Sequence, residues 1–547
     1  MIIFLFASSK MPLTWDEGEV SRRSDELPVK WSGTIDQEGH PQLPIFFAAA
    51  GKIILSDKYF SKKFRLRFIS LFFVSISFTV LFYRLKNEFD LLTAWFSIIS
   101  ILLIPHLFAL LLIAVWDSCL IASWICCLAF FPKSLDKTKD TVIFGFCLGL
   151  AFSSKFSGFV IPIPFAVWSI IILLSDKLPS KVVIFKRIFI VTIISFCTFF
   201  IFNPPFWSDP IFGIIRFFYL NIYREINIPI MFLGRIYDLY HPLPFYNTFF
   251  WTIITIPLGL FFFFIVGCYS ILFRLNKRNE NLLSELTKRR FGLLLILNFI
   301  VLLLIRMLPN MPVHDGTRLF VGSYVFLGII SGIGATIIWR SKKIVIIFAS
   351  KNILSQVITI MIFAVSLFNI FWYYPQWLSF YNFAVGGLSG AVKIGMEATY
   401  YWDGFDNEVI EWLNENTGKD ELILFSKFSP DTFLIYREDG VLLPEFYMSS
   451  KKYDDKKNNS DNSDLDLDSD NSDLDKASRI RFYVTQNRAG LQNAADKFFK
   501  TNSQPVYVKT IRKGGYCTWN IETVPIIEIY DIKSIKTNKK RNNRSVE

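Results

Sequence analysis

Residues that could do chemistry are few in this apolar chain, and they stand near the ends of its apolar runs. They are carboxylates, histidines and basic residues: Asp16, Glu17, His40, Asp117, Lys155, His314 and Arg318. A positioned carboxylate can take a proton from a hydroxyl group, while Lys and Arg can neutralise a departing anion. The combination predicts a transfer reaction in which an acceptor hydroxyl attacks and an anionic group leaves.

Each of these residues also has a structural explanation. An Asp-Glu pair in a loop is often only solvated, Asp117 could cap the helix that follows it, and Arg318 could extend to lipid headgroups. Their common position at one end of the apolar runs favours the functional interpretation. The sequence shows no ligand spacing typical of a metal site, so it requires no cofactor. A divalent cation near Asp16 and Asp117 is compatible with it.

The elements that must position these residues are apolar. The chain has 547 residues, of which 52% are hydrophobic and 19% are charged, and its 59 Phe concentrate in long runs between residues 68 and 373. This composition excludes an ordinary soluble enzyme and a disordered protein, and it is typical of a membrane protein with many spans. The net charge of +12 does not indicate nucleic-acid binding, because most Lys and Arg stand in short loops where they face lipid headgroups.

We expect about ten membrane-spanning helices. The apolar runs lie near residues 68–84, 91–113, 115–131, 141–154, 156–174, 188–204, 246–273, 291–308, 318–339 and 353–373. One set of alternate loops carries 19 Lys and Arg and the opposite set carries three, so the basic set is predicted to be cytoplasmic. Residues 1–67 and the chain after about residue 374 are then predicted to be extracytoplasmic.

Two features of the first 67 residues depart from this pattern. Residues 57–67 carry five basic side chains on the predicted outer face, which is either a tolerated exception or an anchor for an anionic lipid phosphate. The apolar start of the chain is too short for a span. We therefore expect that a first helix is missing before residue 11.

The chain beyond residue 373 has the pattern of a small α+β domain. A helical period in NEVIEWLNEN is followed by four strand-like runs, ELILFS, RIRFYVTQ, PVYVKTI and PIIEIY. Residues 453–476 are acidic and of low complexity, and they lack the Gly and Glu of an EF-hand calcium loop. We interpret them as a disordered insertion.

The order of several segments is as informative as their composition. Trp15-Asp16-Glu17-Gly18 is followed by HPQLP at 40–44, Asp117, GLAFSSKFSG at 149–158, NPPFWSDP at 203–210, HDGTRLFVGSYVFLGI at 314–329 and YYWDG at 400–404. From about residue 12 to 417 this order resembles the GT-C membrane glycosyltransferases of the dolichyl-phosphate-mannose protein mannosyltransferase and aminoarabinose transferase type.

The resemblance implies a fold and an activity. The fold is an all-α polytopic membrane domain (68–373), preceded by an outer catalytic loop with an amphipathic segment (1–67) and followed by the soluble outer domain (374–547). The activity is an inverting transfer of mannose, or of a related hexose or pentose, from a polyprenyl-phosphate donor to a hydroxyl on protein, lipid or glycan.

The resemblance also assigns roles to residues. Asp16 becomes the catalytic carboxylate with Glu17 beside it, and Lys155 and Arg318 become contacts of the lipid phosphate. In the mechanism that follows, Asp117 and His40 are expected to orient the acceptor or a cation, and His314 is expected to bind substrate.

Alternative functions remain at this point. A transporter or flippase of lipid-linked glycans would place ionisable residues near mid-membrane and show internal repeats, which we do not find. A glycan polymerase or ligase would have a long late outer loop, whereas residues 309–317 are short. A third alternative is a membrane anchor whose outer domain binds a partner. An outer-face site favours a prokaryotic cell membrane.

Overall fold

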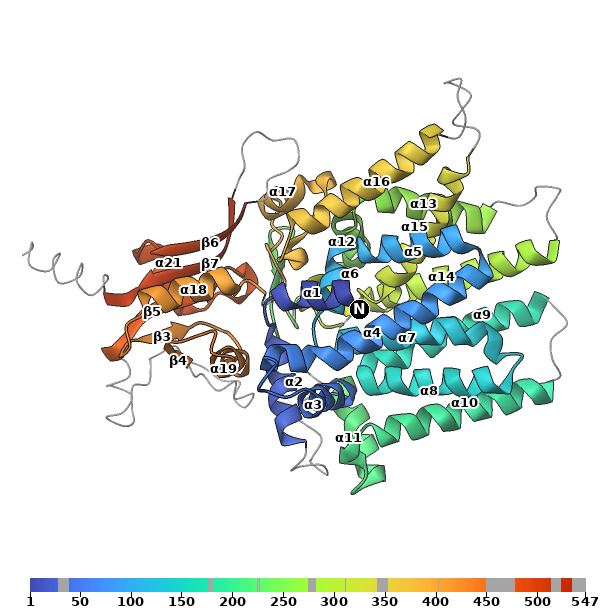
Figure 1. Ribbon diagram of the computed structural model, residues 1–547, viewed down its shortest axis with the longest axis horizontal. Coiled ribbons are helices and arrows are strands. Elements are labelled where there is room, and N and C mark those ends of the chain that lie inside the picture. The colour runs from blue at the N-terminus through green and yellow to red at the C-terminus, as the bar shows by residue number, and fades with distance from the viewer. Residues whose placement is uncertain are drawn as a thin grey trace, which may run out of the picture.

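The computed structural model describes residues 1–27, 39–175, 181–223, 225, 227–273, 282–309, 311–341, 353–401, 403–448, 478–512 and 523–533. Long helices lie side by side in one bundle, and a small domain with a β-sheet lies at one end of it (Figure 1). The N-terminal helices α1 (Ile2–Lys10), α2 (Trp15–Glu26) and α3 (Leu43–Ile54) lie at the same end as this domain. The structure is thus mostly helical, with a small C-terminal α/β domain.

The helices of the bundle follow the predicted apolar runs. They are α4 (Lys62–Glu88), α5 (Leu91–Leu102), α6 (Pro105–Leu111), α7 (Trp116–Ser134), α8 (Thr138–Ser154), α9 (Pro162–Ser175), α10 (Lys181–Ile201), α12 (Asn247–Thr255), α13 (Leu258–Phe273), α14 (Leu282–Arg306), α15 (Ser323–Trp339) and α16 (Ile353–Trp372). Between α10 and α12 lie α11 (Pro210–Tyr223), β1 (Ile230–Phe232) and β2 (Arg235–Tyr237). Side chains between the helices form one large hydrophobic core.

Two of the expected spans are broken helices. The run 91–113 bends by 84° between α5 and α6, and the run 246–273 bends by 118° between α12 and α13. A proline lies at or next to each break, Pro105 and Pro257, and proline removes a helical hydrogen bond and clashes with the preceding turn. Helix α6 begins after the first break. Its buried His106 contacts Thr317, in the segment that follows α14.

Within the described residues, three helices are long and apolar enough to cross a membrane: Lys62–Glu88, Val183–Ile201 and Ile353–Trp372. The number rises to five if each bent pair counts as one span. Their apolar length suits an integral membrane protein. The expected number of about ten spans stays a prediction.

The C-terminal domain contains the predicted helix and strands. The helix is α18 (Asn407–Asn416), and the four predicted strands are β3 (Leu422–Phe425), β5 (Ile480–Gln486), β6 (Tyr507–Arg512) and β7 (Thr523–Asp531). The strand β4 (Glu445–Met448) and the helices α17 (Gly387–Lys393), α19 (Pro430–Glu438) and α21 (Ala494–Asn502) were not predicted. The sheet order is β4-β3-β5-β7-β6, with β4, β3 and β5 parallel. The acidic segment 453–476 lies outside the described residues.

Candidate active site

Three carboxylates meet at one part-buried guanidinium. The Arg318 Nε donates to Asp117 Oδ2 at 2.9 Å, its Nη1 donates to Asp315 Oδ2 at 2.8 Å, and its Nη2 donates to Asp16. The Lys155 Nζ donates to the other oxygen of Asp117 at 2.6 Å. Four of the residues predicted from the sequence therefore lie in direct contact, although up to 302 positions separate them in the chain.

Helix ends position the members of this cluster. Asp16 is in the first turn of α2 and Asp117 is in the first turn of α7, where the helix dipole stabilises a negative charge. Lys155 is the residue at which α8 ends, and its extended backbone turns the chain into the short helix η1 (Phe156–Val160). Arg318 lies in η3 (Gly316–Leu319), which follows the loop after α14. Four separate elements thus converge on one point.

Asp315 is the unusual member of the cluster. Its backbone is in the left-handed region with φ 62°, which is strained for a residue other than glycine. Burial raises the pKa of Asp315 to about 6, against the opposing effects of Arg488 and Lys155. With three carboxylates and two cations in contact, the cluster carries one excess negative charge when Asp315 is ionised.

Glu17 has a different environment from its neighbour Asp16. Its carboxylate accepts from Arg67 Nε at 2.6 Å and Nη2 at 2.7 Å, and also from the backbone N–H of Ala114 and of Thr14. Both side chains are buried. Burial alone would raise the pKa of Glu17, but Arg67 and the hydrogen bonds hold it below its usual value. Both oxygens of Glu17 are therefore occupied within the protein.

Three of the four histidines, His40, His106 and His314, lie next to residues of the cluster. The His40 ring packs on Trp116, the residue before Asp117, with ring centroids 4.6 Å apart. His314 Nε2 is 4.0 Å from Asp315 Oδ2. His106, which we did not select from the sequence, contacts Thr317 Oγ1 at 2.7 Å and the carbonyl of Phe380 at 3.0 Å, and so holds η3 in place.

Two further residues of the site were missed by reasoning from the sequence. Arg67 was counted only as part of the basic stretch 57–67, whereas it is the buried partner of Glu17. Tyr401 places its ring 5.0 Å from the guanidinium carbon of Arg318. The only signal for Tyr401 was its place in the YYWDG segment. Among the described residues, no three His, Cys, Asp or Glu gather as a metal site would require.

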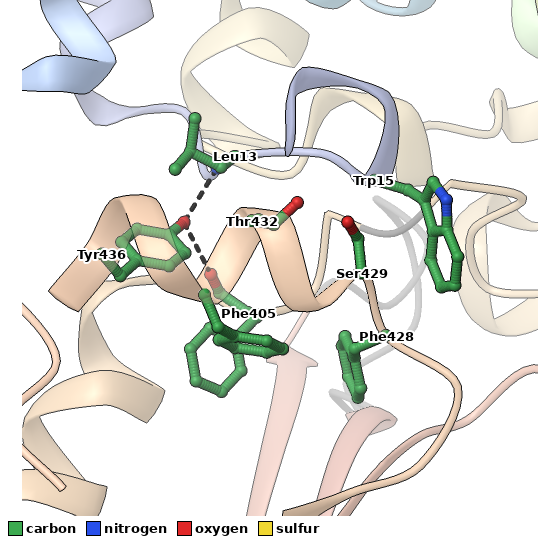
Figure 2. Close-up of a pocket in the computed structure, with 8 residues that line it drawn as sticks. Leu13, Trp15, Phe405, Phe428, Ser429, Thr432 and Tyr436 are labelled. Atoms are coloured by element: carbon green, nitrogen blue, oxygen red, sulfur yellow. Dashed lines mark hydrogen bonds between the residues drawn. The ribbon is translucent and has the colours of Figure 1, made fainter. Parts of the chain in front are cut away.

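The C-terminal domain contacts the start of α2 directly. Thr432 Oγ1 of α19 donates to the carbonyl of Thr14 at 3.0 Å, and the backbone N–H of Leu13 donates to the hydroxyl of Tyr436 at 2.8 Å. The same hydroxyl donates to the carbonyl of Phe405 at 3.3 Å. Figure 2 shows the two bonds of the Tyr436 hydroxyl, with α19 lying along the segment that carries Leu13. The residues just before Asp16 are therefore held by this domain.

Gly18 allows this close approach. A Cβ at position 18 would lie 2.5 Å from the backbone nitrogen of Thr432 and 2.8 Å from Ser429 Oγ. Real Cβ atoms do not come this close to backbone, so α2 and α19 would have to separate. The glycine of the Trp15–Gly18 segment is thus explained by helix packing.

We expect Gly18→Ala to lower the thermal stability of the purified protein. The overlap with α19 costs about 1–3 kcal/mol, which outweighs the gain in helix propensity of about 1 kcal/mol. The control is Gly418→Ala, where the three atoms nearest to the new Cβ belong to the Glu421 side chain and lie 3.4 Å or more away. Thermal unfolding in detergent measures both. Equal melting temperatures for the two variants would contradict the proposed packing.

Comparisons with known proteins agree with this architecture. The family model of dolichyl-phosphate-mannose-protein mannosyltransferase matches residues 40–207. The apo crystal structure of ArnT from Cupriavidus metallidurans superposes with a TM-score of 0.51 at 10% identity, covering 96% of each chain. The chain has the GT-C fold. It resembles the mannosyltransferase and aminoarabinose transferase type within that fold, as the sequence predicted.

Two other solved structures have lower scores. ArnT bound to undecaprenyl phosphate gives a TM-score of 0.47 at 12% identity, again over 96% of each chain. The Archaeoglobus fulgidus oligosaccharyltransferase AglB, in complex with an inhibitory peptide and a dolichol-phosphate, gives 0.45 at 10% identity, over 89% of this chain and 68% of AglB. No curated protein sequence matches this GT-C chain significantly.

Proposed function

We propose that this GT-C protein is an inverting glycosyltransferase that moves a sugar from a polyprenyl-phosphate donor to a hydroxyl acceptor. The observation that carries the proposal is the contact of Asp16 and Asp117 with Arg318 and Lys155. A general base and two cations then lie within one site, as the chemistry requires. The match to the mannosyltransferase family supports a lipid-linked donor.

The proposed reaction is a single displacement. Asp16 accepts the proton of the acceptor hydroxyl, whose oxygen forms a bond to the anomeric carbon. The bond from that carbon to the phosphate oxygen breaks, and its electron pair leaves on the polyprenyl phosphate. Arg318 and Lys155 stabilise this anion. Asp117 holds both cations in place, and Glu17 acts by fixing the first turn of α2 through Arg67.

The proposal extends to the surroundings of the site. Residues 1–67 are the catalytic loop, 68–373 the membrane domain and 374–547 an extracytoplasmic domain. The site faces outward from a prokaryotic cell membrane. His40 and His314 orient substrates at its edge. Mannose is the preferred sugar because the matching family is a mannosyltransferase family, and the acceptor is a hydroxyl of protein, lipid or glycan.

A donor panel tests the proposed function. Membranes that contain the chain are incubated with cell extract and radiolabelled polyprenyl-phosphate mannose, related polyprenyl-phosphate sugars, or the corresponding nucleotide sugars. We expect label in protein, lipid or glycan from at least one lipid-linked donor, and none from a nucleotide sugar when lipid-linked sugar synthesis is blocked. Transfer from nucleotide sugars alone would contradict the proposal, and no transfer at all would favour a transporter.

Donor affinity is expected to weaken as pH rises through about 6. Below that pH Asp315 is protonated, and the cluster of three aspartates with Arg318 and Lys155 is neutral. Above it, the added negative charge opposes an anionic donor whose phosphodiester charge is constant. The KM for the donor should rise on the order of tenfold between pH 5 and 7.5, since one nearby charge near a protein surface is worth roughly 1–4 kcal/mol.

Asp315→Asn should abolish this pH dependence and keep a low KM at pH 7.5. His314 is 4.0 Å from Asp315, so His314→Gln is the comparison. His314→Gln should keep the rise of the donor KM with pH. A KM that still rises in Asp315→Asn would assign the effect to another group.

A further inference from the structure

A second group of buried polar side chains lies beside the Arg318 cluster, where strand β5 ends. Gln486 is the last residue of β5, and its Nε2 donates to the backbone carbonyl of Tyr401 at 2.7 Å. The ring of Tyr401 is 5.0 Å from the guanidinium carbon of Arg318. Strands β4, β3 and β5 are parallel, and ligands commonly bind at the carboxyl ends of parallel strands. The C-terminal domain therefore places such a strand end next to the cluster.

Asp403 lies two residues after Tyr401, and its position is fixed. The hydroxyl of Thr399 donates to Asp403 Oδ1 at 2.7 Å and accepts from the N–H of Tyr401 at 3.1 Å. Burial raises the pKa of Asp403 to about 6, so the carboxylate is mostly ionised at neutral pH. Arg488 attracts the carboxylates of both Asp403 and Asp315. Asp403 therefore shares a cationic neighbour with the Arg318 cluster.

One oxygen of each of these two side chains has no hydrogen-bond partner among the described residues. The atoms are Asp403 Oδ2 and Gln486 Oε1, and the two residues are only 1% and 6% exposed. A buried polar atom without a partner destabilises a folded protein, and a charged group does so most. Both atoms are acceptors. The partner that they lack is therefore a group that brings hydrogen-bond donors.

Asp406 makes a direct comparison, because it is a buried aspartate three residues further along the chain. Its Oδ1 accepts from the N–H of Val409 at 3.4 Å and caps α18. Its Oδ2 accepts from Gln376 Nε2 at 2.8 Å and lies 3.1 Å from Lys509 Nζ. The protein therefore satisfies both oxygens of one buried aspartate in this region, but only one oxygen of Asp403.

We propose that Asp403 and Gln486 bind hydroxyl groups of the sugar that the polyprenyl-phosphate donor carries. This assignment rests on the proposed function. Sugar hydroxyls are hydrogen-bond donors, and a donor phosphate held at Arg318 brings its sugar to this part of the protein. A carboxylate and an amide at fixed positions accept from hydroxyls of one arrangement and stay unpaired with others. The two residues thus select the sugar, and the C-terminal domain supplies part of this specificity.

The test compares donors that differ by a single hydroxyl. Purified protein in lipid nanodiscs receives an acceptor fraction and either polyprenyl-phosphate mannose or an analogue that lacks one sugar hydroxyl, and kcat/KM is measured for each donor. We expect the parent to prefer mannose over at least one analogue by about 100-fold or more, because a buried acceptor then stays unpaired. Asp403→Asn should lower kcat/KM for mannose and reduce that preference to less than about tenfold.

Asp406→Asn is the matched control, since both oxygens of Asp406 are paired within the protein. It should lower the melting temperature and keep every preference of the parent. Gln486→Met is the second variant, and it keeps the test decisive if Asp403→Asn does not fold. It should also weaken the preference for mannose over one of the analogues.

The outcomes separate this inference from the proposed function. A parent that transfers mannose and every analogue equally well overturns the inference alone and assigns the two oxygens to buried water. Unchanged preferences in both Asp403→Asn and Gln486→Met overturn it too, even if their rates fall for all donors. A parent that transfers no lipid-linked sugar contradicts the proposed function and the inference with it.

Discussion

Asp16→Asn is expected to reduce sugar transfer by about 10²–10⁴-fold while leaving the protein folded. The amide has the size of the carboxylate and can still accept from Arg318, so the packing of α2 is kept. It cannot accept the proton of the acceptor hydroxyl at neutral pH. The loss should therefore be in kcat, while the KM for the donor should fall, because one negative charge leaves the cluster around Arg318. Initial rates at varied donor concentration measure this.

The matched control for Asp16 is Glu19→Gln on the same helix. Glu19 pairs with Arg23 at 2.6 Å within α2. Its amide variant should keep parental rates. If Asp16→Asn retains more than a tenth of the parental kcat, another group is the base, and Asp117 becomes the candidate because it shares the same guanidinium.

Glu17→Ala is expected to produce the largest loss of stability. The substitution leaves the Arg67 guanidinium buried without its carboxylate and removes the acceptor for two backbone N–H groups. Breaking a buried ion pair from one side costs about 3–5 kcal/mol. The protein should unfold at a clearly lower temperature, or fail to accumulate, and any activity loss should follow the folded fraction.

A double variant separates the loss of the ion pair from the other consequences of Glu17→Ala. Glu17→Met with Arg67→Met replaces two buried charges by apolar side chains of similar length, and such replacements are often close to neutral. It should melt at a higher temperature than Glu17→Ala, although the backbone N–H groups of Thr14 and Ala114 remain unsatisfied. If Glu17→Ala melts like the parent and only loses activity, Glu17 has a chemical role beside Asp16.

The helices of the bundle could be predicted because apolar runs of sufficient length have few alternatives. The apolar runs did not show whether each of them forms one continuous helix. Residues 91–113 and 246–273 each read as one apolar segment, and the structure bends both at a proline. In the C-terminal domain, short alternating runs gave the four strands, whereas α19 was missed because its sequence, PDTFLIYRE, has no distinct apolar period.

The site was only partly predictable, because its contacts are long-range. Residue type and order pointed to Asp16, Asp117, Lys155 and Arg318, and the structure places these four in contact. No feature of the sequence near Glu17 indicated that its carboxylate would pair with Arg67, which follows 50 positions later. The left-handed backbone of Asp315 and the ring of Tyr401 on Arg318 likewise depend on tertiary packing.

The most direct test of the account is a stoichiometric transfer measurement. Purified protein in nanodiscs is given polyprenyl-phosphate mannose labelled in both sugar and lipid phosphate, together with an acceptor fraction identified from the donor panel. We predict one polyprenyl phosphate released for each sugar transferred by the parent, inversion at the anomeric carbon, and a yield of both products from Asp16→Asn that is lower by about 100-fold or more. Equal turnover by Asp16→Asn, or a transferred sugar that retains its phosphate, would contradict the account.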